Sequence, residues 1–262
     1  MNFNSVDNYI RCCFNQPGKG NQDDSIVLVE IFYARTGDLV SELPWLVAYI
    51  DNNERLKAEK FHFENDRNTY LTCHSLLRKV ISYKLNKDPS EINIIYDGNN
   101  KPWLKSNQLF FNISHTRDTF AFAISDYVKI GIDLENINSS IDFKAIIRTY
   151  FSSGEEKYIL QDHEQSMDRF FLLWTRKEAL LKALGTGIID KLKDVEVFRR
   201  ENHLKKGSFN SLIDNSMLRD HYIYTMKLDN NYLSVAVPCK AKIIFHHLDI
   251  NEIRNLIQDL PL

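Results

Sequence analysis

The sequence predicts an α+β protein built from two similar lobes, each a small antiparallel sheet packed with helices. Helical periodicity over Asp51–Leu85 is followed by short strand-like runs, and the same order of helices and then strands returns after Asp142. The linkers between the strand-like runs are too short for parallel crossovers, so we expect antiparallel meanders. The two lobes are expected to meet near Asp126, as an N-terminal lobe of residues 1–126 and a C-terminal lobe of residues 127–262.

Three observations on composition limit the class of protein. With 262 residues and 44% hydrophobic content, the chain can bury a sizeable core. Its 33 basic and 35 acidic residues nearly cancel, so no global field favours nucleic acid or an anionic membrane, and any phosphate-binding patch must be local. No secretory signal or membrane-length apolar stretch is visible, so we expect a cytoplasmic protein with no nucleic-acid or membrane partner.

The cysteines point to the same compartment. They form no Cys-x-x-Cys pair, and neither they nor the histidines show the spacing of a zinc site. We therefore interpret the cysteines as reduced and mostly buried thiols. The four cysteines are Cys12, Cys13, Cys73 and Cys239.

In the first half of the chain, a polar loop over Asn15–Asp24 precedes a predicted strand, Ile26–Tyr33. The helical region that follows should end before Pro89. Three strand-like runs then predict a meander: Leu109–Ser114, Phe120–Ser125 and Tyr127–Glu135.

In the second half, a helical region over Asp142–Leu184 is interrupted at Ser152-Ser153-Gly154, where a serine can cap a new helix with Glu155 in its first turn. Gly185 and Gly187 should stop the last helix. Further elements are predicted as strands Val195–Phe198, Tyr222–Leu228, Tyr232–Val237 and Lys240–Leu248, a turn at Asp229-Asn230-Asn231, and a final amphipathic helix, Asn251–Leu260.

Asp133 and Glu135 provide the first part of a candidate metal site. Side chains at i and i+2 of a strand share a face, so both carboxylates point the same way from an apolar segment. Taken alone, the pair favours the solvated face of an ordinary strand, where acidic and apolar residues often alternate. The metal-site hypothesis is strengthened by Gly131, which permits close backbone approach, and by the apolar neighbours on the strand.

Glu178 and Lys182 add a third carboxylate and a cation on one face of a helix. They could equally form a surface ion pair worth roughly a few tenths of a kcal/mol. The helix is apolar over most of its circumference, however, and charges on an enclosed helix usually have a partner or a function. Three carboxylates and a lysine suit a magnesium-bound diphosphate, because Mg2+ takes one or two carboxylates and fills its octahedron with water and phosphate oxygens. Phosphoryl-group chemistry is therefore the leading hypothesis.

Polar residues at a strand end form a further candidate group. In Phe111–His115, an amide, the hydroxyl of Ser114 and the imidazole of His115 could hold a phosphate or a nucleotide, although a lone histidine in this position is more often structural. Lys101 and Pro102 are ordinary turn chemistry by themselves. The absence of a Gly-x-x-x-x-Gly-Lys-Ser/Thr segment and of a Gly-x-Ser-x-Gly elbow excludes P-loop and α/β-hydrolase chemistry.

Taken in order, five segments resemble the 4'-phosphopantetheinyl transferases, specifically the large single-chain type typified by the surfactin-synthetase activator. The last segment is highly specific because it fixes many residue types at set spacing. The resemblance covers the chain from Asp51 to Gly187, and its segments are Asn100-Lys101-Pro102, Phe111-Asn112-Ile113-Ser114-His115, Gly131-Ile132-Asp133-Leu134-Glu135, Tyr150-Phe151-Ser152 with Glu155, and Trp174–Gly187.

The resemblance implies a monomeric pseudo-dimer of two lobes that binds coenzyme A in the cleft between them. It also implies roles for particular residues: magnesium ligands at Asp133, Glu135 and Glu178, a diphosphate contact at Lys182, nucleotide-phosphate contacts at Ser114 and His115, and the adenine beside Lys101 and Pro102. Two departures concern the nucleotide. Asn100 stands where the family usually has glycine, and an arginine that binds the 3'-phosphate in several members falls at Thr69, which leaves Arg67, Lys57 or Arg78 for that contact.

The implied reaction moves the phosphopantetheine arm of coenzyme A to a serine of an apo carrier protein and releases adenosine 3',5'-bisphosphate. Magnesium bridges the diphosphate, Lys182 offsets developing charge and a carboxylate takes the serine proton. Glu178 is the first candidate for that base, directly or through a metal-bound water, and Glu155 is the second. The expected partner is a small acidic helical carrier domain, from peptide, polyketide or fatty-acid synthesis, which the sequence does not distinguish.

Two alternatives use the same residues. A non-catalytic protein of this fold could bind coenzyme A or a carrier without transfer, but the intact Asp133, Glu135, Glu178 and Lys182 argue against it. A magnesium-dependent nuclease or phosphodiesterase would use the same carboxylates, but it predicts a basic binding face that the balanced charge does not indicate.

Overall fold

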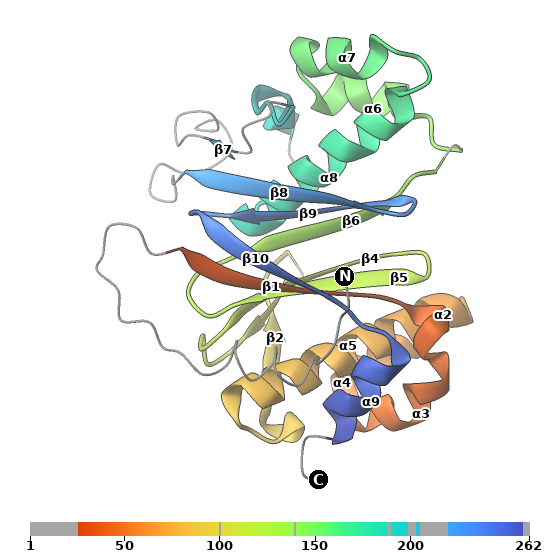
Figure 1. The fold of residues 1–262 in the computed structure, drawn as a ribbon, viewed down its shortest axis with the longest axis vertical. Coiled ribbons are helices and arrows are strands. Elements are labelled where there is room, and N and C mark those ends of the chain that lie inside the picture. Colours follow the sequence, from red (N-terminus) through yellow and green to blue (C-terminus); the bar gives the residue numbers. More distant parts are fainter. Residues whose placement is uncertain are drawn as a thin grey trace, which may run out of the picture.

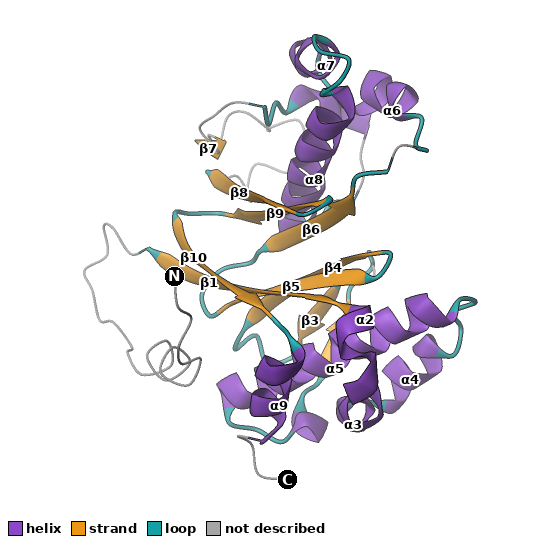
Figure 2. Cartoon of the chain, turned by 45° about the vertical axis from the view of Figure 1, so that its right-hand side comes forward, coloured by secondary structure: helices purple, strands orange, loops and turns teal. Residues whose placement is uncertain are grey.

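Helices and sheets stack in four layers, in the order helices, sheet, sheet, helices (Figure 1). The computed structural model describes residues 26–99, 101–138, 140–187, 190–198, 203–204 and 220–258. Figure 2 shows the helices confined to the two outer faces and the strands to the middle. The α+β class predicted from the sequence is therefore confirmed. The predicted loop at Asn15–Asp24, as well as Cys12, Cys13 and Asn100, lies outside the described residues.

The first sheet joins the two ends of the described chain. Its strand order is β10-β1-β5-β4, with β1 antiparallel to β5, β5 antiparallel to β4, and β10 parallel to β1. The prediction of an antiparallel sheet is therefore wrong at β10, because the segment after β9 returns to lie parallel to β1. The division of the chain near Asp126 remains a prediction. The strands are β1 (Val27–Arg35), β4 (Phe110–Thr116), β5 (Thr119–Ser125) and β10 (Ala241–His247).

The second sheet is antiparallel throughout, with the order β6-β9-β8-β7. The predicted three-strand meander is wrong at its third member, because β5 has both edges occupied by β1 and β4, and β6 pairs with β9 instead. Residues 229–230 form the predicted turn between β8 and β9. The strands are β6 (Gly131–Asn136), β7 (His203–Leu204), β8 (His221–Leu228) and β9 (Asn231–Val237).

The predicted strand at Val195–Phe198 is also wrong. This segment follows a 3-10 turn, Asp190–Asp194, and is irregular. Side chains take the backbone groups that a strand partner would use: the N–H of Val197 donates to Glu155, and its carbonyl accepts from Arg176. The segment is therefore tied to helices rather than to a sheet.

One helical layer covers the outer face of the first sheet around α5, which packs against β5, α3 and α4. The single helical region predicted after Asp51 is two helices. Asp51 caps the first, α4, which ends at Ala58, and the second, α5, begins at Glu64. Beside this layer lies a two-stranded hairpin, β2 with β3. The elements are α2 (Thr36–Leu39), α3 (Leu43–Leu46), α4 (Asn52–Ala58), α5 (Glu64–Leu85), β2 (Ile94–Tyr96), β3 (Pro102–Leu104) and α9 (Ile250–Gln258).

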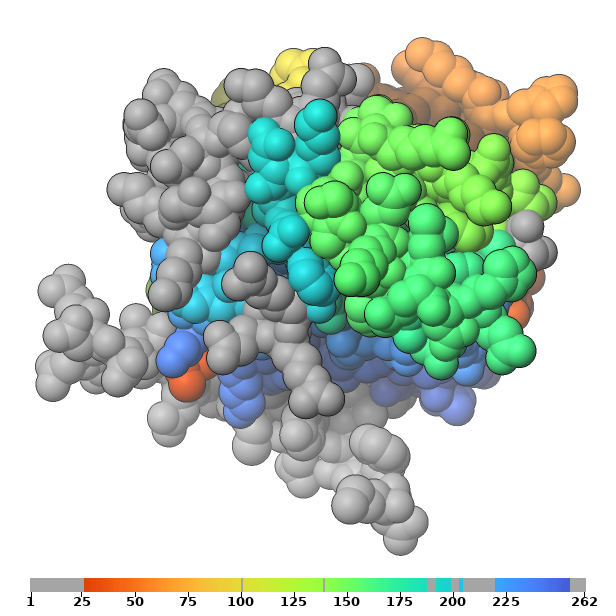
Figure 3. Space-filling model, turned by 90° about the horizontal axis from the view of Figure 1, so that it is seen from above, coloured from red at the N-terminus to blue at the C-terminus, as the bar shows by residue number. Residues whose placement is uncertain are grey.

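The other helical layer covers the second sheet, where α8 packs across β6, β9 and β8. Ser152 and Glu155 form the predicted capping box at the start of α7, and α8 ends at Gly185 with φ of 74°. Figure 3 views this face from above and shows residues of α6–α8 and of 190–198 spread over it. The helices are α6 (Phe143–Tyr150), α7 (Ser153–Leu160) and α8 (Ser166–Leu184).

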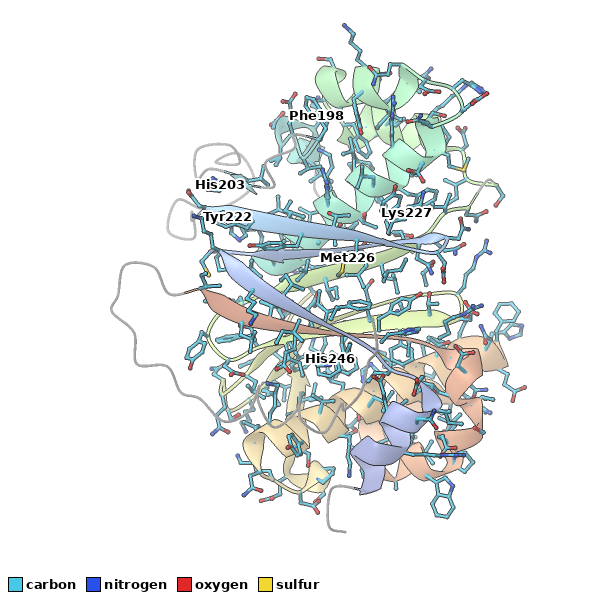
Figure 4. All side chains as sticks on the ribbon, viewed as in Figure 1. Phe198, His203, Tyr222, Met226, Lys227 and His246 are labelled. Atoms are coloured by element: carbon cyan, nitrogen blue, oxygen red, sulfur yellow. The ribbon has the colours of Figure 1, made fainter. Side chains whose placement is uncertain are left out.

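Each helical layer packs on its sheet over an apolar core, and a third apolar core fills the space between the two sheets. It takes alternate side chains from both inner faces, among them Ile31, Ala123, Ile132 and Val235. Met226 on β8 packs against this core and lies between the sheets in Figure 4. None of the helices within the described ranges is long and apolar enough to cross a membrane.

Candidate active site

The candidate site begins with an unusually close packing of α8 on β6. A Cβ placed on Gly131 would lie 2.1 Å from the carbonyl oxygen of Ala179 and 2.2 Å from the backbone nitrogen of Ala183. Because both atoms belong to the helix backbone, only glycine fits at this position. The close approach predicted from Gly131 is therefore confirmed, and it brings the residues of α8 directly over those of β6.

Asp133 on β6, Lys182 on α8 and Ser114 on β4 form one hydrogen-bonded cluster. Lys182 Nζ lies 2.7 Å from Asp133 Oδ1 and 3.0 Å from Ser114 Oγ. Ser114 Oγ also donates to Asp133 Oδ1 at 3.2 Å. Asp133 is only 4% exposed, so this ion pair is screened little by solvent on the side of the carboxylate.

Two carboxylate oxygens at this site lack a hydrogen-bond partner among the described residues. Asp133 Oδ2 and Glu178 Oε1 are both buried and receive no hydrogen bond from any residue that the structure describes. A buried acceptor without a donor costs about 1–3 kcal/mol, and more when the group is charged. Because both atoms belong to acids whose charges act on each other, they mark a candidate position for a cation.

Burial and neighbouring charges shift the pKa values of the two glutamates at this site. Burial raises the pKa of Glu178 to about 7, and the charge of Asp133 adds to the effect while Lys182 opposes it. Burial and the charges of Asp133 and Glu178 likewise raise the pKa of Glu135 to about 7, although Lys182 and a hydrogen bond from Trp174 oppose the rise. The three predicted metal ligands and Lys182 are thus within electrostatic reach of one another.

The residues present fit magnesium better than zinc or calcium. Within the described ranges, no three His, Cys, Asp or Glu side chains already converge as a formed metal centre. Mg2+ needs only one or two carboxylates, with water and phosphate supplying the other oxygens, whereas zinc and calcium sites draw most ligands from the protein. The two unpartnered oxygens of Asp133 and Glu178 match that small requirement, with Glu135 beside them.

Trp174 is a site residue to which sequence reasoning assigned no role. Its side chain donates a hydrogen bond to Glu135, which helps to hold that carboxylate in place. A signal was present in the helical spacing, since Trp174, Glu178 and Lys182 follow one another at intervals of four residues and so share a face of α8.

The loop before β3 is fastened to the end of α8. Lys101 Nζ donates to the carbonyl oxygen of Lys182 and to that of Ile130, the latter at 3.3 Å. Asn99 Nδ2 donates to the carbonyl oxygen of Gly185 at 2.8 Å. Burial lowers the pKa of Lys101 to about 8, and the neighbouring Lys129 adds to the effect. Pro102 follows as the first residue of β3. The ammonium of Lys101, expected beside the adenine, therefore also caps a helix.

His115 lies at the exposed end of β4, directly after Ser114. Partial burial of its ring lowers its pKa, and the positive charges of Lys182 and His74 act in the same direction. The structure thus brings His115 near the carboxylate cluster, as a polar group at its rim.

Glu155 lies apart from this cluster. Its carboxylate is fully buried and bonds to Lys177 Nζ at 2.9 Å, to the N–H of Val197 at 2.8 Å and to the N–H of Ser152 at 3.1 Å. A carboxylate with 0% exposure and all of these partners has no surface to present to a substrate. The prediction of Glu155 as a second candidate base is corrected accordingly: its contacts make it a helix cap and half of a buried ion pair.

The candidates for the 3'-phosphate occupy different environments. Arg78 is 1% exposed and is held by Asp51, Glu54 and the carbonyl oxygen of Ile92, so it serves the core of the helical layer. Thr69 is buried and its hydroxyl lies 2.8 Å from that of Thr36. Two candidates remain at the surface: Arg67 in the first turns of α5, and Lys57 on α4, which stacks over the rings of Tyr70 and Tyr96.

Comparison with known proteins found two family models on this chain. The model of the 4'-phosphopantetheinyl transferase superfamily matches residues 129–232, and the model described as 4'-phosphopantetheinyl transferase, N-terminal, matches residues 39–126. The first range contains Asp133, Glu135, Glu178 and Lys182, and the second contains Ser114. All residues of the cluster thus lie within the matched ranges.

Similar individual proteins carry the same description. The 4'-phosphopantetheinyl transferase HetI of Nostoc sp. is 32% identical over 163 residues, which cover 60% of this chain and 68% of that protein. The 4'-phosphopantetheinyl transferase psf-1 of Bacillus pumilus is 34% identical over 149 residues, or 56% of this chain and 63% of that protein. AcpT of Escherichia coli K12, a 4'-phosphopantetheinyl transferase, is 34% identical over 110 residues, or 41% of this chain and 55% of that protein.

Proposed function

The chain belongs to the 4'-phosphopantetheinyl transferase superfamily, and from this premise we propose that it transfers the 4'-phosphopantetheine arm of coenzyme A to a serine of an apo carrier protein. The observation that carries the proposal is the pair of unpartnered, buried oxygens on Asp133 and Glu178 beside the ammonium of Lys182. Two acceptors and a cation at one place suit a metal-bound diphosphate.

The metal and the diphosphate are assigned to neighbouring residues. Asp133 Oδ2 and Glu178 Oε1 would hold Mg2+, with Glu135 as the third ligand, and the ion would neutralise part of the charge on the diphosphate when bound. Lys182 would contact the same diphosphate, because its side chain is 30% exposed and its ammonium already faces the cluster.

The transfer step needs a group that takes the proton of the carrier serine. The serine oxygen attacks the phosphorus that bears the pantetheine arm, the bond from that phosphorus to the oxygen of adenosine 3',5'-bisphosphate breaks, and the serine proton passes to Glu178. Glu178 is our candidate for this base, directly or through a metal-bound water, because its carboxylate lies within electrostatic reach of Asp133 and Lys182.

The nucleotide is assigned to the first sheet and its helices. His115, which follows Ser114 at the rim of the cluster, would contact a nucleotide phosphate, and Lys101 and Pro102 would lie beside the adenine. Arg67, at the surface of α5, is our candidate for the 3'-phosphate. We further propose that residues 1–126 and 127–262 act as two lobes of a pseudo-dimer with the cleft between them, because each four-stranded sheet carries its own helical layer. β10 and α9 of the second range cross back to complete the first sheet and its helical layer.

The proposed setting is a cytoplasmic monomer that meets a small acidic helical carrier domain. The decisive experiment incubates the protein with coenzyme A, Mg2+ and a panel of apo carriers and reads intact carrier mass. We expect a gain equal to the phosphopantetheine arm on at least one carrier, abolished by EDTA and by Glu178→Ala. Binding of coenzyme A without a mass gain on any carrier would refute transfer and favour a non-catalytic binding protein.

A further inference from the structure

The two sheets are joined by side chains where their edge strands meet. β4 is an edge of the first sheet and β6 is an edge of the second, and the two lie close together without a ladder between them. Instead, the N–H of Ile132 donates to Asn112 Oδ1 at 2.8 Å, and the N–H of Leu134 donates to Ser114 Oγ at 3.1 Å. Both acceptors are buried, so they satisfy donors on β6 that water does not reach.

The hydroxyl of Ser114 has every hydrogen-bonding position filled. A serine hydroxyl has one proton and two acceptor lone pairs. The lone pairs accept from the N–H of Leu134 and from Lys182 Nζ, at 3.1 and 3.0 Å. The single proton must then point to Asp133 Oδ1, which lies 3.2 Å away. No position is left on this hydroxyl for a phosphate while these contacts persist.

This arrangement decides which oxygen of Asp133 is free. Oδ1 accepts from both Ser114 and Lys182, and Oδ2 accepts from neither and stays buried without a partner in the described part of the chain. Because Ser114 is itself fixed by the backbone of Leu134, it holds the carboxylate in one rotation relative to β6. Glu178, whose pKa the charge of Asp133 helps to raise, carries a second buried oxygen with no partner among the described residues.

We propose that Ser114 is a positioning residue for the divalent cation: by holding Oδ1 of Asp133 and the ammonium of Lys182, it keeps Oδ2 of Asp133 available as a metal ligand. This inference rests on the proposed function, and it assigns Ser114 a role other than the nucleotide-phosphate contact that the family resemblance implies. Partners that orient a metal ligand typically change metal affinity by about 10- to 100-fold when removed.

The experiment measures metal binding and nucleotide binding separately in the full chain. Mn2+ is the probe for the magnesium site, because it accepts the same oxygen ligands and its binding can be followed by electron paramagnetic resonance without turnover. Adenosine 3',5'-bisphosphate in EDTA is the probe for the nucleotide side. The control is Ser234→Ala: Ser234 pairs with Asp133 across the β6–β9 ladder and is equally buried, but its hydroxyl bonds to Thr225.

We expect Ser114→Ala to weaken Mn2+ binding by about tenfold or more, with nucleotide affinity in EDTA unchanged, and Ser234→Ala to change neither. Ser114→Thr, which restores a hydroxyl, should recover most of the Mn2+ affinity and guards against a trivial folding defect. Unchanged Mn2+ affinity in Ser114→Ala would overturn the proposal, as would a loss confined to the nucleotide or an absence of Mn2+ binding in the wild type. Transfer to a carrier by the wild type, assayed in parallel, shows whether the proposed function survives either result.

Discussion

Two carboxylate–lysine pairs include a lysine of α8: a filled pair, whose polar atoms all have hydrogen-bond partners, and an unfilled pair, in which one carboxylate oxygen has none among the described residues. In the first, Lys177 and Glu155 are both 0% exposed, and Lys177 Nζ also donates to the carbonyl oxygens of Leu192 and Val195. In the second, Lys182 is 30% exposed and Asp133 keeps one buried oxygen with no donor among the described residues.

The difference separates a structural pair from the pair for which we propose a function. A buried ion pair with every position filled fixes one arrangement of the elements that carry it, here α7, α8 and the segment after residue 190. A pair with unfilled acceptors leaves part of the desolvation cost uncompensated, which a bound ligand can offset. Since both pairs share α8, the filled pair anchors the helix on which the unfilled pair depends.

The largest expected effect follows from removing the unfilled acceptors. Glu178→Ala or Asp133→Ala should lower carrier modification on the order of 10^3-fold or more, because each removes a proposed metal ligand. Glu178→Ala should leave the free energy of unfolding unchanged or slightly higher, since a buried, crowded carboxylate is lost. Intact-mass assays and urea unfolding measure the two quantities. Full activity of either variant at saturating Mg2+ would remove that residue from the mechanism.

Disrupting the filled pair should instead lower the free energy of unfolding. Lys177→Met leaves the carboxylate of Glu155 buried without its cation, which should lower the free energy of unfolding by about 3–5 kcal/mol. The matched control is Lys182→Met, the same substitution on the same helix, where the partial exposure of the ammonium and the remaining hydrogen bond from Ser114 to Asp133 should limit the loss to about 1–3 kcal/mol. Equal losses in the two variants, measured by urea unfolding, would show that the pairs do not differ as described.

A third change acts on the packing that brings the unfilled pair together. Gly131→Ala forces the backbones of β6 and α8 apart, so we expect a loss of about 1–3 kcal/mol in the free energy of unfolding and reduced Mn2+ affinity. Gly37→Ala, where nothing lies within 4 Å of the added carbon, should change stability by no more than about 0.5 kcal/mol. If both glycine variants behave alike in unfolding and metal titration, the close contact has no influence on the site.

Local periodicity was enough to predict the faces on which the residues of the unfilled pair lie, but not that Lys182 pairs with Asp133. Asp133 sits on a strand face set by alternation, and Glu178 and Lys182 share a helix face set by spacing of four residues. The cap at Ser152 and the end of α8 at Gly185 were likewise readable, because capping depends on residues only a few positions apart.

Long-range partners could not be read in the same way. β6 was expected to pair with β5, and only the insertion of β5 between β1 and β4 shows why it cannot. The helix-capping contact of Lys101 joins positions separated by 81 residues, and the N–H of Val197 reaches Glu155 across 42. No short pattern encodes such contacts, which arise from how layers stack once the sheets have formed.

The last expected effect is the pH dependence of the two glutamates beside the unfilled pair. Glu135 and Glu178 have pKa values raised to about 7 from 4.5, so the folded protein binds protons more tightly than the unfolded chain between these values. Their contribution to stability is therefore fully present below about pH 4.5 and is lost as the pH rises through about 7. In EDTA, we expect the melting temperature to fall across this range more steeply than in the double variant Glu135→Gln, Glu178→Gln.

Magnesium should reverse that dependence in the wild type alone. Metal ligands must be deprotonated, so added Mg2+ should raise the melting temperature more at pH 8 than at pH 5.5, and its binding near pH 6 should release protons into a weak buffer. The filled pair gives the contrast, since Lys177→Met should lower stability at both pH values without altering proton release. Equal proton release by the wild type and the double variant would mean that the two glutamates are not where the cation binds.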